Sequence, residues 1–199
     1  MEKLVNYLRN FPHQGGIIVN EEKKFIYMKP CKTAGTSILR YSLENKIQGI
    51  FHYKDHKVDY INWLNGLDEK KISKYFIFSI VRNPYDRIIS CCSHFGISLD
   101  YFIHHYKNNS LKKIVFEHSL PLTKYNYYEN LKFTKFTGRF ENLEIDYSKI
   151  CKILNIKKHI LPHTNRSNRS AYQNYYNNSQ INEISKIYKE DLENFNYSF

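Results

Sequence analysis

The chain has 199 residues, of which 42% are hydrophobic and 25% are charged, a composition that excludes an intrinsically disordered protein. A chain of this length folds as one domain and buries enough surface to need neither disulfides nor a structural metal. Its 30 Lys and Arg residues against 19 Asp and Glu residues give a net charge of +11, which favours anionic partners such as phosphates, sulfates, nucleic acids or acidic glycans.

The cysteines and the first residues indicate a cellular compartment. Cys31, Cys91, Cys92 and Cys151 show no CxxC spacing, and the start MEKLVNYLRNF lacks the apolar core of a secretion signal. No stretch of about 18 apolar residues indicates a membrane span. We therefore expect a reduced, cytoplasmic protein. No repeat or linker-like stretch divides the chain, so we expect residues 1–199 to form a single domain.

Two short apolar runs, Phe25–Met28 and Phe76–Val81, have the length and the β-branched or aromatic content of buried strands. Each is followed by a polar loop and then by a helical pattern; the loops are KPCKTAGTS and RNPYDR. Strand, loop and helix repeated in this way predict an α/β fold with a central parallel sheet flanked by helices. Such a sheet binds its ligands beyond the carboxyl ends of the strands.

The rest of the chain is less regular. Residues 98–132 are expected to be mostly helical, on a weak pattern. Residues 143–154 carry apolar side chains at helical spacing after an expected Asn142 cap, and one further helix is expected after Ser179. Residues 156–178 are polar and predict a long ordered loop or lid.

The first loop, Lys29–Ser37, combines a lysine, several hydroxyls and a glycine at the start of a helix. Free N–H groups at a helix N-terminus suit a phosphate, and Gly35 lets the backbone approach an oxyanion closely. Taken alone, the loop could equally be a helix start capped by Ser or Thr. No Gly-Lys pair occurs in the chain, so the G-x-x-x-x-G-K-[ST] loop of magnesium-dependent nucleotide enzymes is absent.

The second loop, Arg82–Ser90, supplies a planar cation and, further along, a hydroxyl. Two anion-binding loops at neighbouring strand ends imply a ligand with two anionic groups. The structural alternative is an ion-paired turn in which Asp86 holds Arg87.

With both loops considered together, the sequence resembles the sulfotransferases that use 3'-phosphoadenosine 5'-phosphosulfate (PAPS), especially the carbohydrate type. The resemblance rests on FIYMKPCKTAGTSI, FIFSIVRNPYDRIISCCSHF, GRFENLE, LPHTNRS and IYKEDLENFNY, and it touches most of residues 25–197. It implies the P-loop-nucleotide-kinase-like sulfotransferase fold. The implied activity moves a sulfuryl group from PAPS to a hydroxyl of a glycan or similar acceptor, with the 3',5'-bisphosphate PAP as product and no metal.

The resemblance also implies roles for individual residues. By its position in the motif, Lys32 stabilises the negative charge that develops on the leaving 5'-phosphate oxygen. The 5'-phosphosulfate is expected on Lys32, Thr33, Ala34, Gly35, Thr36 and Ser37. The 3'-phosphate is expected on Arg82 and Ser90. A loop with Asn165, Arg166 and Ser167 is expected to close over the adenine and the 3'-phosphate, a solvated basic loop being the alternative.

The acceptor hydroxyl needs a general base, and histidine is the usual choice near neutral pH. In related sulfotransferases the base lies between the two donor loops, which leaves His56 and His52, and the segment YKDHKVDY around His56 is closer to the family pattern. Glu141 is the reserve candidate, with a structural ion pair to Arg139 as the alternative. A zinc site at His52 and His56 is disfavoured because no HExxH motif or further ligand accompanies them.

Three other hypotheses remain: an ATP-dependent small-molecule kinase, a non-catalytic polyanion-binding protein and a degenerate sulfotransferase that binds donor without turnover. Stacking on nucleic acid is disfavoured, because the aromatic residues fall mostly on apolar stripes and predicted strands, where burial explains them. Residues 45–75 and 98–132 would shape the acceptor site, and they carry no motif that names the acceptor.

Overall fold

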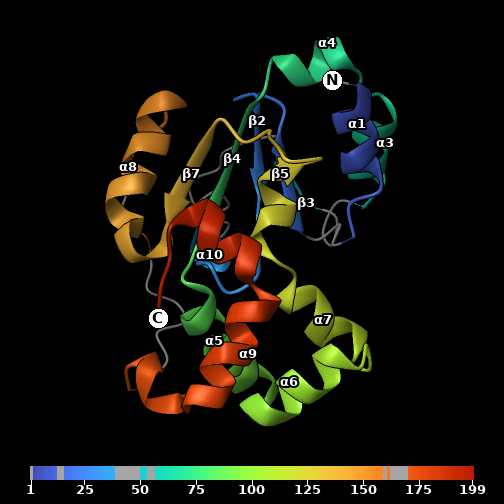
Figure 1. Ribbon diagram of the computed structural model, residues 1–199. Coiled ribbons are helices and arrows are strands. Elements are labelled where there is room, and N and C mark those ends of the chain that lie inside the picture. The colour runs from blue at the N-terminus through green and yellow to red at the C-terminus, as the bar shows by residue number, and fades with distance from the viewer. Residues whose placement is uncertain (1, 13–15, 39–49, 53–56, 159–160, 162–169) are drawn as a thin grey trace.

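The computed structural model describes residues 2–12, 16–38, 50–52, 57–158, 161 and 170–199. Figure 1 shows a central sheet with helices against both faces and a group of helices beyond one edge. Helices and a mostly parallel central sheet make up the structure, so the predicted single α/β domain is confirmed.

The central sheet contains five strands: β1 (Ile17–Asn20), β2 (Phe25–Met28), β3 (Ile50–His52), β4 (Phe76–Val81) and β7 (Phe136–Arg139). Their order is β3-β1-β2-β4-β7. β2, β4 and β7 pair in parallel, whereas β1 pairs antiparallel with both of its neighbours, so the other four strands share one direction. The two predicted strands have the predicted bounds, and β1 adds an antiparallel strand that the sequence pattern does not indicate.

Each face of the sheet is covered. The covering helices are α1 (Glu2–Arg9), α3 (Lys57–Asn65) and α4 (Glu69–Ser73) on one face and α8 (Leu143–Ile153) on the other. Ile26 and Ile77 pack toward the first group of helices, and Tyr27 and Phe78 pack toward α8. Because the central strands are buried on both sides, they form continuous apolar runs that are legible in the sequence.

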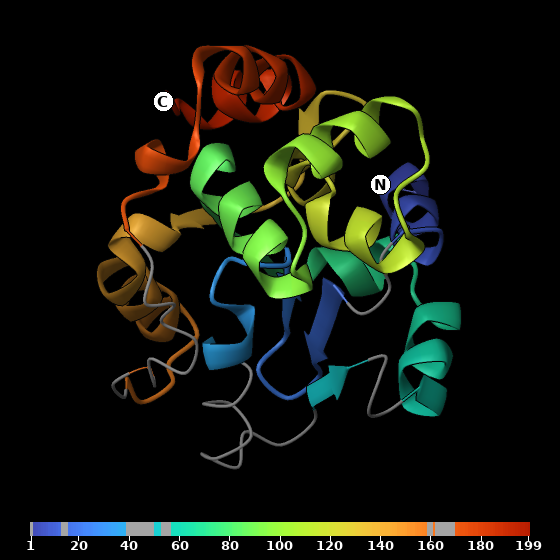
Figure 2. The same cartoon turned by 90° about the horizontal axis from the view of Figure 1, so that it is seen from below.

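A layer of helices lies beyond the carboxyl ends of the strands (Figures 1 and 2). It comprises α5 (Pro84–Phe95), α6 (Leu99–Lys107), α7 (Lys113–Ser119) and α9 (Asn178–Ile187). Ile88, Phe102 and Ile184 belong to one apolar cluster that joins α5, α6 and α9. The helical prediction for residues 98–132 is confirmed by α6, α7 and the short helix η2 (Leu122–Tyr125), which the hairpin of β5 (Tyr127–Tyr128) and β6 (Leu131–Lys132) follows.

Two details of the later helices differ from the prediction. α8 follows the short helix η3 (Phe140–Asn142), and Asn142 makes no capping hydrogen bond with its side chain. The single helix expected after Ser179 is divided into α9 and α10 (Lys189–Phe195). Tyr188 lies between them, fully buried, and its hydroxyl donates to the carbonyl of Ser119 at 2.7 Å. This tertiary contact holds Tyr188 at the turn between α9 and α10, although the spacing of apolar residues predicts one continuous helix.

The described part of residues 156–178 agrees with the predicted loop. There the only regular element before α9 is the short helix η4 (Tyr172–Tyr175).

Candidate active site

The first predicted loop leaves the carboxyl end of β2 and enters a helical turn at residues 35–38. Lys32 and Ala34 adopt left-handed backbone conformations, with φ of 66° and 64°. For a non-glycine residue this conformation costs about 1 kcal/mol or more. Left-handed residues alternating with others turn successive N–H groups toward one side, the arrangement that binds oxyanions. The strained backbone therefore favours an anion-binding loop over a simple helix cap.

Two residues shape this loop from inside. The side chain of Thr33 is fully buried, and its hydroxyl donates to the carbonyl of Pro30 at 2.9 Å. A Cβ atom at Gly35 would lie 2.5 Å from Cγ of Lys29, so glycine leaves the space that the Lys29 side chain fills. Thr36, by contrast, is exposed on the loop surface.

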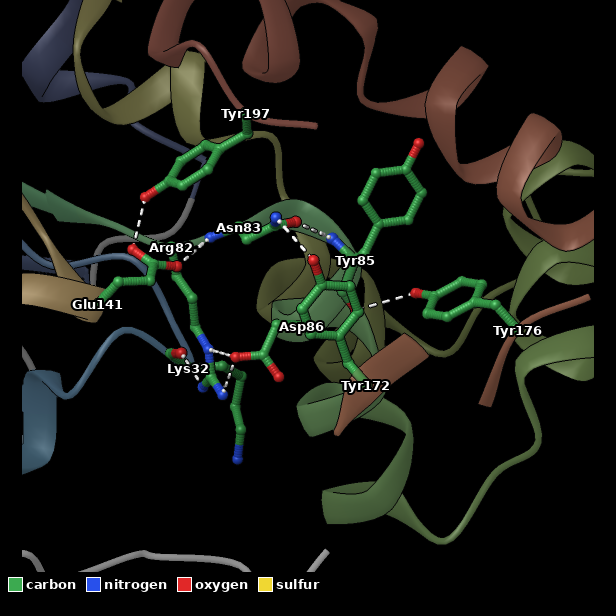
Figure 3. A network of polar contacts seen from close by, with 9 residues as sticks. All are labelled: Lys32, Arg82, Asn83, Tyr85, Asp86, Glu141, Tyr172, Tyr176 and Tyr197. Atoms are coloured by element: carbon green, nitrogen blue, oxygen red, sulfur yellow. Dashed lines mark hydrogen bonds and ion pairs between the residues drawn. The ribbon is translucent and has the colours of Figure 1, made fainter. Parts of the chain in front are cut away.

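Arg82 joins the second loop to the first (Figure 3). Its guanidinium group donates to the carbonyl of Lys32 at 2.9 Å and makes two contacts with Asp86, at 2.7 and 2.6 Å. The guanidinium carbon also lies 4.0 Å from the ring centroid of Phe140, and the Arg82 side chain is only 9% exposed. The two loops are therefore held side by side, as the expectation of a ligand with two anionic groups requires.

The ion pair in this loop differs from the one that the sequence suggests. Asp86 pairs with Arg82, not with Arg87. Arg87 is 1% exposed and donates to the carbonyls of Ser119 and Leu120 at 3.2 and 2.9 Å. Because Asp86 and Arg87 are successive residues of α5, their side chains leave the helix about 100° apart. The side chain of Asp86 faces the first loop, and the side chain of Arg87 enters the helical layer.

Asn83 starts α5 and anchors its N-terminus. Its side-chain oxygen accepts a hydrogen bond from the N–H of Tyr85 at 3.0 Å, and Pro84 takes the first helical position. Its amide nitrogen donates to the carbonyl of Ser198 at 2.8 Å. Phe199 packs edge-on against Tyr85, with ring centroids 5.0 Å apart. Residues after α10 therefore hold the start of α5.

Glu141 is engaged by the same part of the fold. Its two carboxylate oxygens accept hydrogen bonds from the backbone N–H of Asn83 and from the hydroxyl of Tyr197, each at 2.8 Å (Figure 3). The alternative ion pair with Arg139 does not form within the described residues. Arg139 instead lies over the ring of Tyr197, 4.5 Å from its centroid, and donates to the carbonyl of Phe195. Glu141 is thus a structural anchor, which disfavours its reserve role as a base.

The other predicted residues divide into two groups. Ser90 is partly buried on α5, one turn beyond Asp86. His52 ends β3 opposite Ile18 of β1, so its backbone lies at the carboxyl edge of the sheet and is separated from β2 by β1. The remaining predicted residues lie outside the described part of the chain: His56, Asn165, Arg166 and Ser167.

Two histidines that the sequence does not single out lie near this site. His94 is exposed on α5, His118 is partly buried on α7, and their rings stack with centroids 5.9 Å apart and an angle of 17° between planes. Burial lowers the pKa of each ring, and the nearby ammonium group of Lys32 lowers it further. No spacing in the sequence could reveal this group, because only the fold brings α5, α7 and the first loop together.

Comparison with known protein families agrees with this geometry. A sequence profile of the sulfotransferase family matches residues 15–198, a span that includes both loops and every strand of the central sheet. The chain therefore belongs to the sulfotransferase family, whose enzymes transfer a sulfuryl group. No curated protein and no solved structure matches the chain.

The described residues lack two further features. They contain no group of three or more His, Cys, Asp or Glu side chains placed to hold a metal ion. None of their helices has the length and apolar character needed to cross a membrane.

Proposed function

We propose that the protein transfers a sulfuryl group from PAPS to a hydroxyl of a glycan or similar acceptor and releases PAP. The observation that carries the proposal is the hydrogen bond from Arg82 to the carbonyl of Lys32, which holds the two donor-like loops side by side. PAPS carries anionic groups on the 5' and 3' positions of one ribose, and a pair of adjoining anion loops suits such a molecule. The net charge of +11 also favours an anionic donor.

In this proposal the first loop binds the reacting end of PAPS. Backbone N–H groups near Gly35 and the hydroxyls of Thr36 and Ser37 hold the 5'-phosphate. Buried Thr33 and left-handed Ala34 keep the loop in shape. As the acceptor oxygen attacks sulfur, the bond from sulfur to the bridging oxygen breaks and its electron pair stays on the 5'-phosphate. The ammonium group of Lys32 stabilises that charge, which is larger in the transition state than in the bound donor.

The second loop would position the donor. Arg82 holds the two loops together through its contacts with Lys32 and Asp86. The hydroxyl of Ser90 donates a hydrogen bond to the 3'-phosphate. This phosphate is remote from sulfur, so its binding energy serves to orient the reacting group. Asn165, Arg166 and Ser167 would close over the adenine and the 3'-phosphate. The family resemblance supports His56 or His52 as the general base.

Isothermal titration calorimetry tests the donor assignment. PAP should bind at least about tenfold more tightly than adenosine 5'-phosphate, with no requirement for magnesium, because a hydrogen bond to a charged phosphate contributes about 1.5–3 kcal/mol. Ser90→Ala should weaken PAP about tenfold and leave the affinity for adenosine 5'-phosphate unchanged. Ser93→Ala, an exposed position on the same helix, is the matched control. Equal affinities for the two nucleotides, or magnesium-dependent binding of ATP in preference to PAP, would refute the proposal.

We also propose that the whole chain is one sulfotransferase domain working in the cytoplasm. All four cysteines are free thiols, and three of them are buried. Burial raises the pKa of Cys91 to about 11 and that of Cys92 to about 12. Such thiols stay protonated and unreactive in a reducing compartment.

A further inference from the structure

A carboxylate lies beside the place that the 3'-phosphate of the donor is proposed to occupy. Asp86 and Ser90 are four residues apart on α5, so their side chains are neighbours on one side of the helix, with Cβ atoms about 6 Å apart. Ser90 is the proposed partner of the 3'-phosphate. A side chain that repels anions is therefore one helical turn away from a bound anion, and two anion-binding loops by themselves do not require it.

The contacts of Asp86 with Arg82 use one of its two carboxylate oxygens. Nε and Nη2 of Arg82 donate to Oδ2 at 2.7 and 2.6 Å. Figure 3 shows the other oxygen, Oδ1, turned away from the guanidinium group. Each carboxylate oxygen accepts more than one hydrogen bond, so Asp86 can accept from a ligand while it holds Arg82. Its side chain is 19% exposed and can be reached from the site.

The position of this carboxylate is fixed. Arg82 donates to the carbonyl of Lys32 at 2.9 Å and lies over the ring of Phe140, so its guanidinium group is held from two further sides. Its two contacts with Oδ2 hold Asp86 in turn. A negatively charged oxygen is therefore a built part of the surface that the nucleotide meets.

A fixed carboxylate discriminates between the groups of a ribose. It accepts a hydrogen bond from a hydroxyl, and it repels a phosphate. In PAPS and in PAP the carbon next to the one that carries the 3'-phosphate carries a free 2'-hydroxyl. A nucleotide with its 3'-phosphate at Ser90 therefore has a hydrogen-bond donor directly beside that phosphate, where Asp86 offers an acceptor.

We propose that Asp86 is a specificity-determining residue that accepts a hydrogen bond from the 2'-hydroxyl of the donor. It favours a ribose with a 3'-phosphate and a free 2'-hydroxyl over the 2'-deoxy sugar and over the isomer with its phosphate at the 2' position. The inference rests on the proposed function. It adds to that function the residue that distinguishes the two neighbouring positions of the ribose.

Isothermal titration calorimetry of the full chain tests this role with PAP, 2'-deoxy-PAP and adenosine 2',5'-bisphosphate. The wild type should bind PAP about tenfold more tightly than 2'-deoxy-PAP, because the deoxy sugar cannot donate to the carboxylate. Asp86→Ala should bring this ratio of affinities to about one. Asp86→Asn, which removes only the charge, should bind the 2',5'-bisphosphate about tenfold more tightly than the wild type does.

The ratio of affinities separates recognition from a merely structural role. If Asp86 only positioned Arg82, its loss would weaken PAP and 2'-deoxy-PAP to the same extent, and the ratio would stay as in the wild type. The matched control Asp100→Ala removes an exposed acidic residue from the first turn of α6. It should leave the affinities for all three nucleotides unchanged.

The outcomes also separate this inference from the proposed function. Equal binding of PAP and 2'-deoxy-PAP by the wild type, or a wild-type ratio in Asp86→Ala, would overturn the inference and leave the donor assignment standing. Asp86→Asn keeps the size of the side chain, so it decides the matter if Asp86→Ala does not fold: an unchanged affinity for the 2',5'-bisphosphate would overturn the inference. If the wild type binds PAP no more tightly than adenosine 5'-phosphate, the proposed function fails and this inference fails with it.

Discussion

Lys32 serves the candidate site through three different parts of one residue. Its backbone is left-handed, with φ of 66°, and this shapes the loop. Its carbonyl accepts the hydrogen bond that fixes Arg82. Its ammonium group points away from that contact (Figure 3). The first two properties belong to the backbone and do not require a lysine side chain, whereas the proposed catalytic role belongs to the side chain alone.

The variant Lys32→Gly separates the backbone properties of this residue from the proposed role of its side chain. Glycine adopts the left-handed conformation without strain, so the free energy of unfolding should rise by up to about 1 kcal/mol. At the same time kcat should fall about 10²- to 10³-fold, because the charge that stabilises the leaving oxygen is gone. Urea unfolding and PAPS turnover measure the two effects.

A matched control is Lys24→Gly, at a left-handed lysine in the β1–β2 turn with φ of 50°. It relieves similar backbone strain outside the candidate site and should leave kcat unchanged. A Lys32→Gly enzyme that keeps its wild-type kcat would remove Lys32 from the reaction.

At the scale of elements, α5 organises most of the site. Asn83 and Pro84 fix its start, and Gly96 ends it in a left-handed cap with φ of 63°. One side buries Ile88 in the helical layer, and another presents Asp86, Ser90 and His94. The start of this helix therefore sets the position of the second loop.

Asn83→Ala should weaken both the fold and donor binding. It removes the α5 cap and leaves the carbonyl of Ser198 without its amide donor, which together should cost about 2 kcal/mol of unfolding free energy. PAP affinity should fall as well, because the second loop loses its anchor. Asn177→Ala removes the comparable cap of α9, so it should lower stability with PAP affinity intact. Equal effects of the two variants on PAP binding would contradict this role of Asn83.

The elements that the sequence predicts best are those whose local pattern and tertiary setting agree. Phe25–Met28 and Phe76–Val81 are continuous apolar runs because helices cover both faces of the sheet. By contrast, α5 begins at Pro84, inside the segment RNPYDR that the pattern predicts as a loop. Tyr188 divides the last helix through a hydrogen bond to Ser119, a contact that no local pattern contains. The partner of Asp86 is instead a local one, because Arg82 lies four residues earlier.

For the whole molecule, the sheet order brings the two loops together. β2 and β4 are neighbouring parallel strands, so the loops that follow them meet at one edge. The motifs predict this meeting. They do not predict the Arg82 bridge, the anchoring by residues 197–199 or the approach of His118, since each of these depends on segments distant in sequence. Loop motifs thus predict that the two loops meet, but not the contacts that hold them in place.

The stability of the protein at acid pH depends on Glu21, which lies far from the two loops of the candidate site. Burial tends to raise the pKa of Glu21, but hydrogen bonds from Lys24, Tyr75 and Lys71 outweigh it and lower the pKa to about 2. A carboxylate with a lowered folded-state pKa stabilises the protein above its ordinary value of 4.5, and that stability is lost as pH falls toward 2.

Glu21→Gln should therefore flatten the loss of stability between pH 4.5 and 2, by up to about 1.4 kcal/mol per pH unit. Urea unfolding measured across this range checks the slope. Glu22→Gln, at the neighbouring exposed carboxylate, should leave the slope as in the wild type. If the two variants give the same slope, the lowered pKa of Glu21 is wrong.

Tyr197, Ser198 and Phe199 contact Glu141, Asn83 and Tyr85, so the start of α5 depends on residues more than 100 positions later in the sequence. Removal of these three residues would leave the sequence of both loops intact. It would nevertheless free the first turn of α5, so the second loop would lose contacts that fix its position.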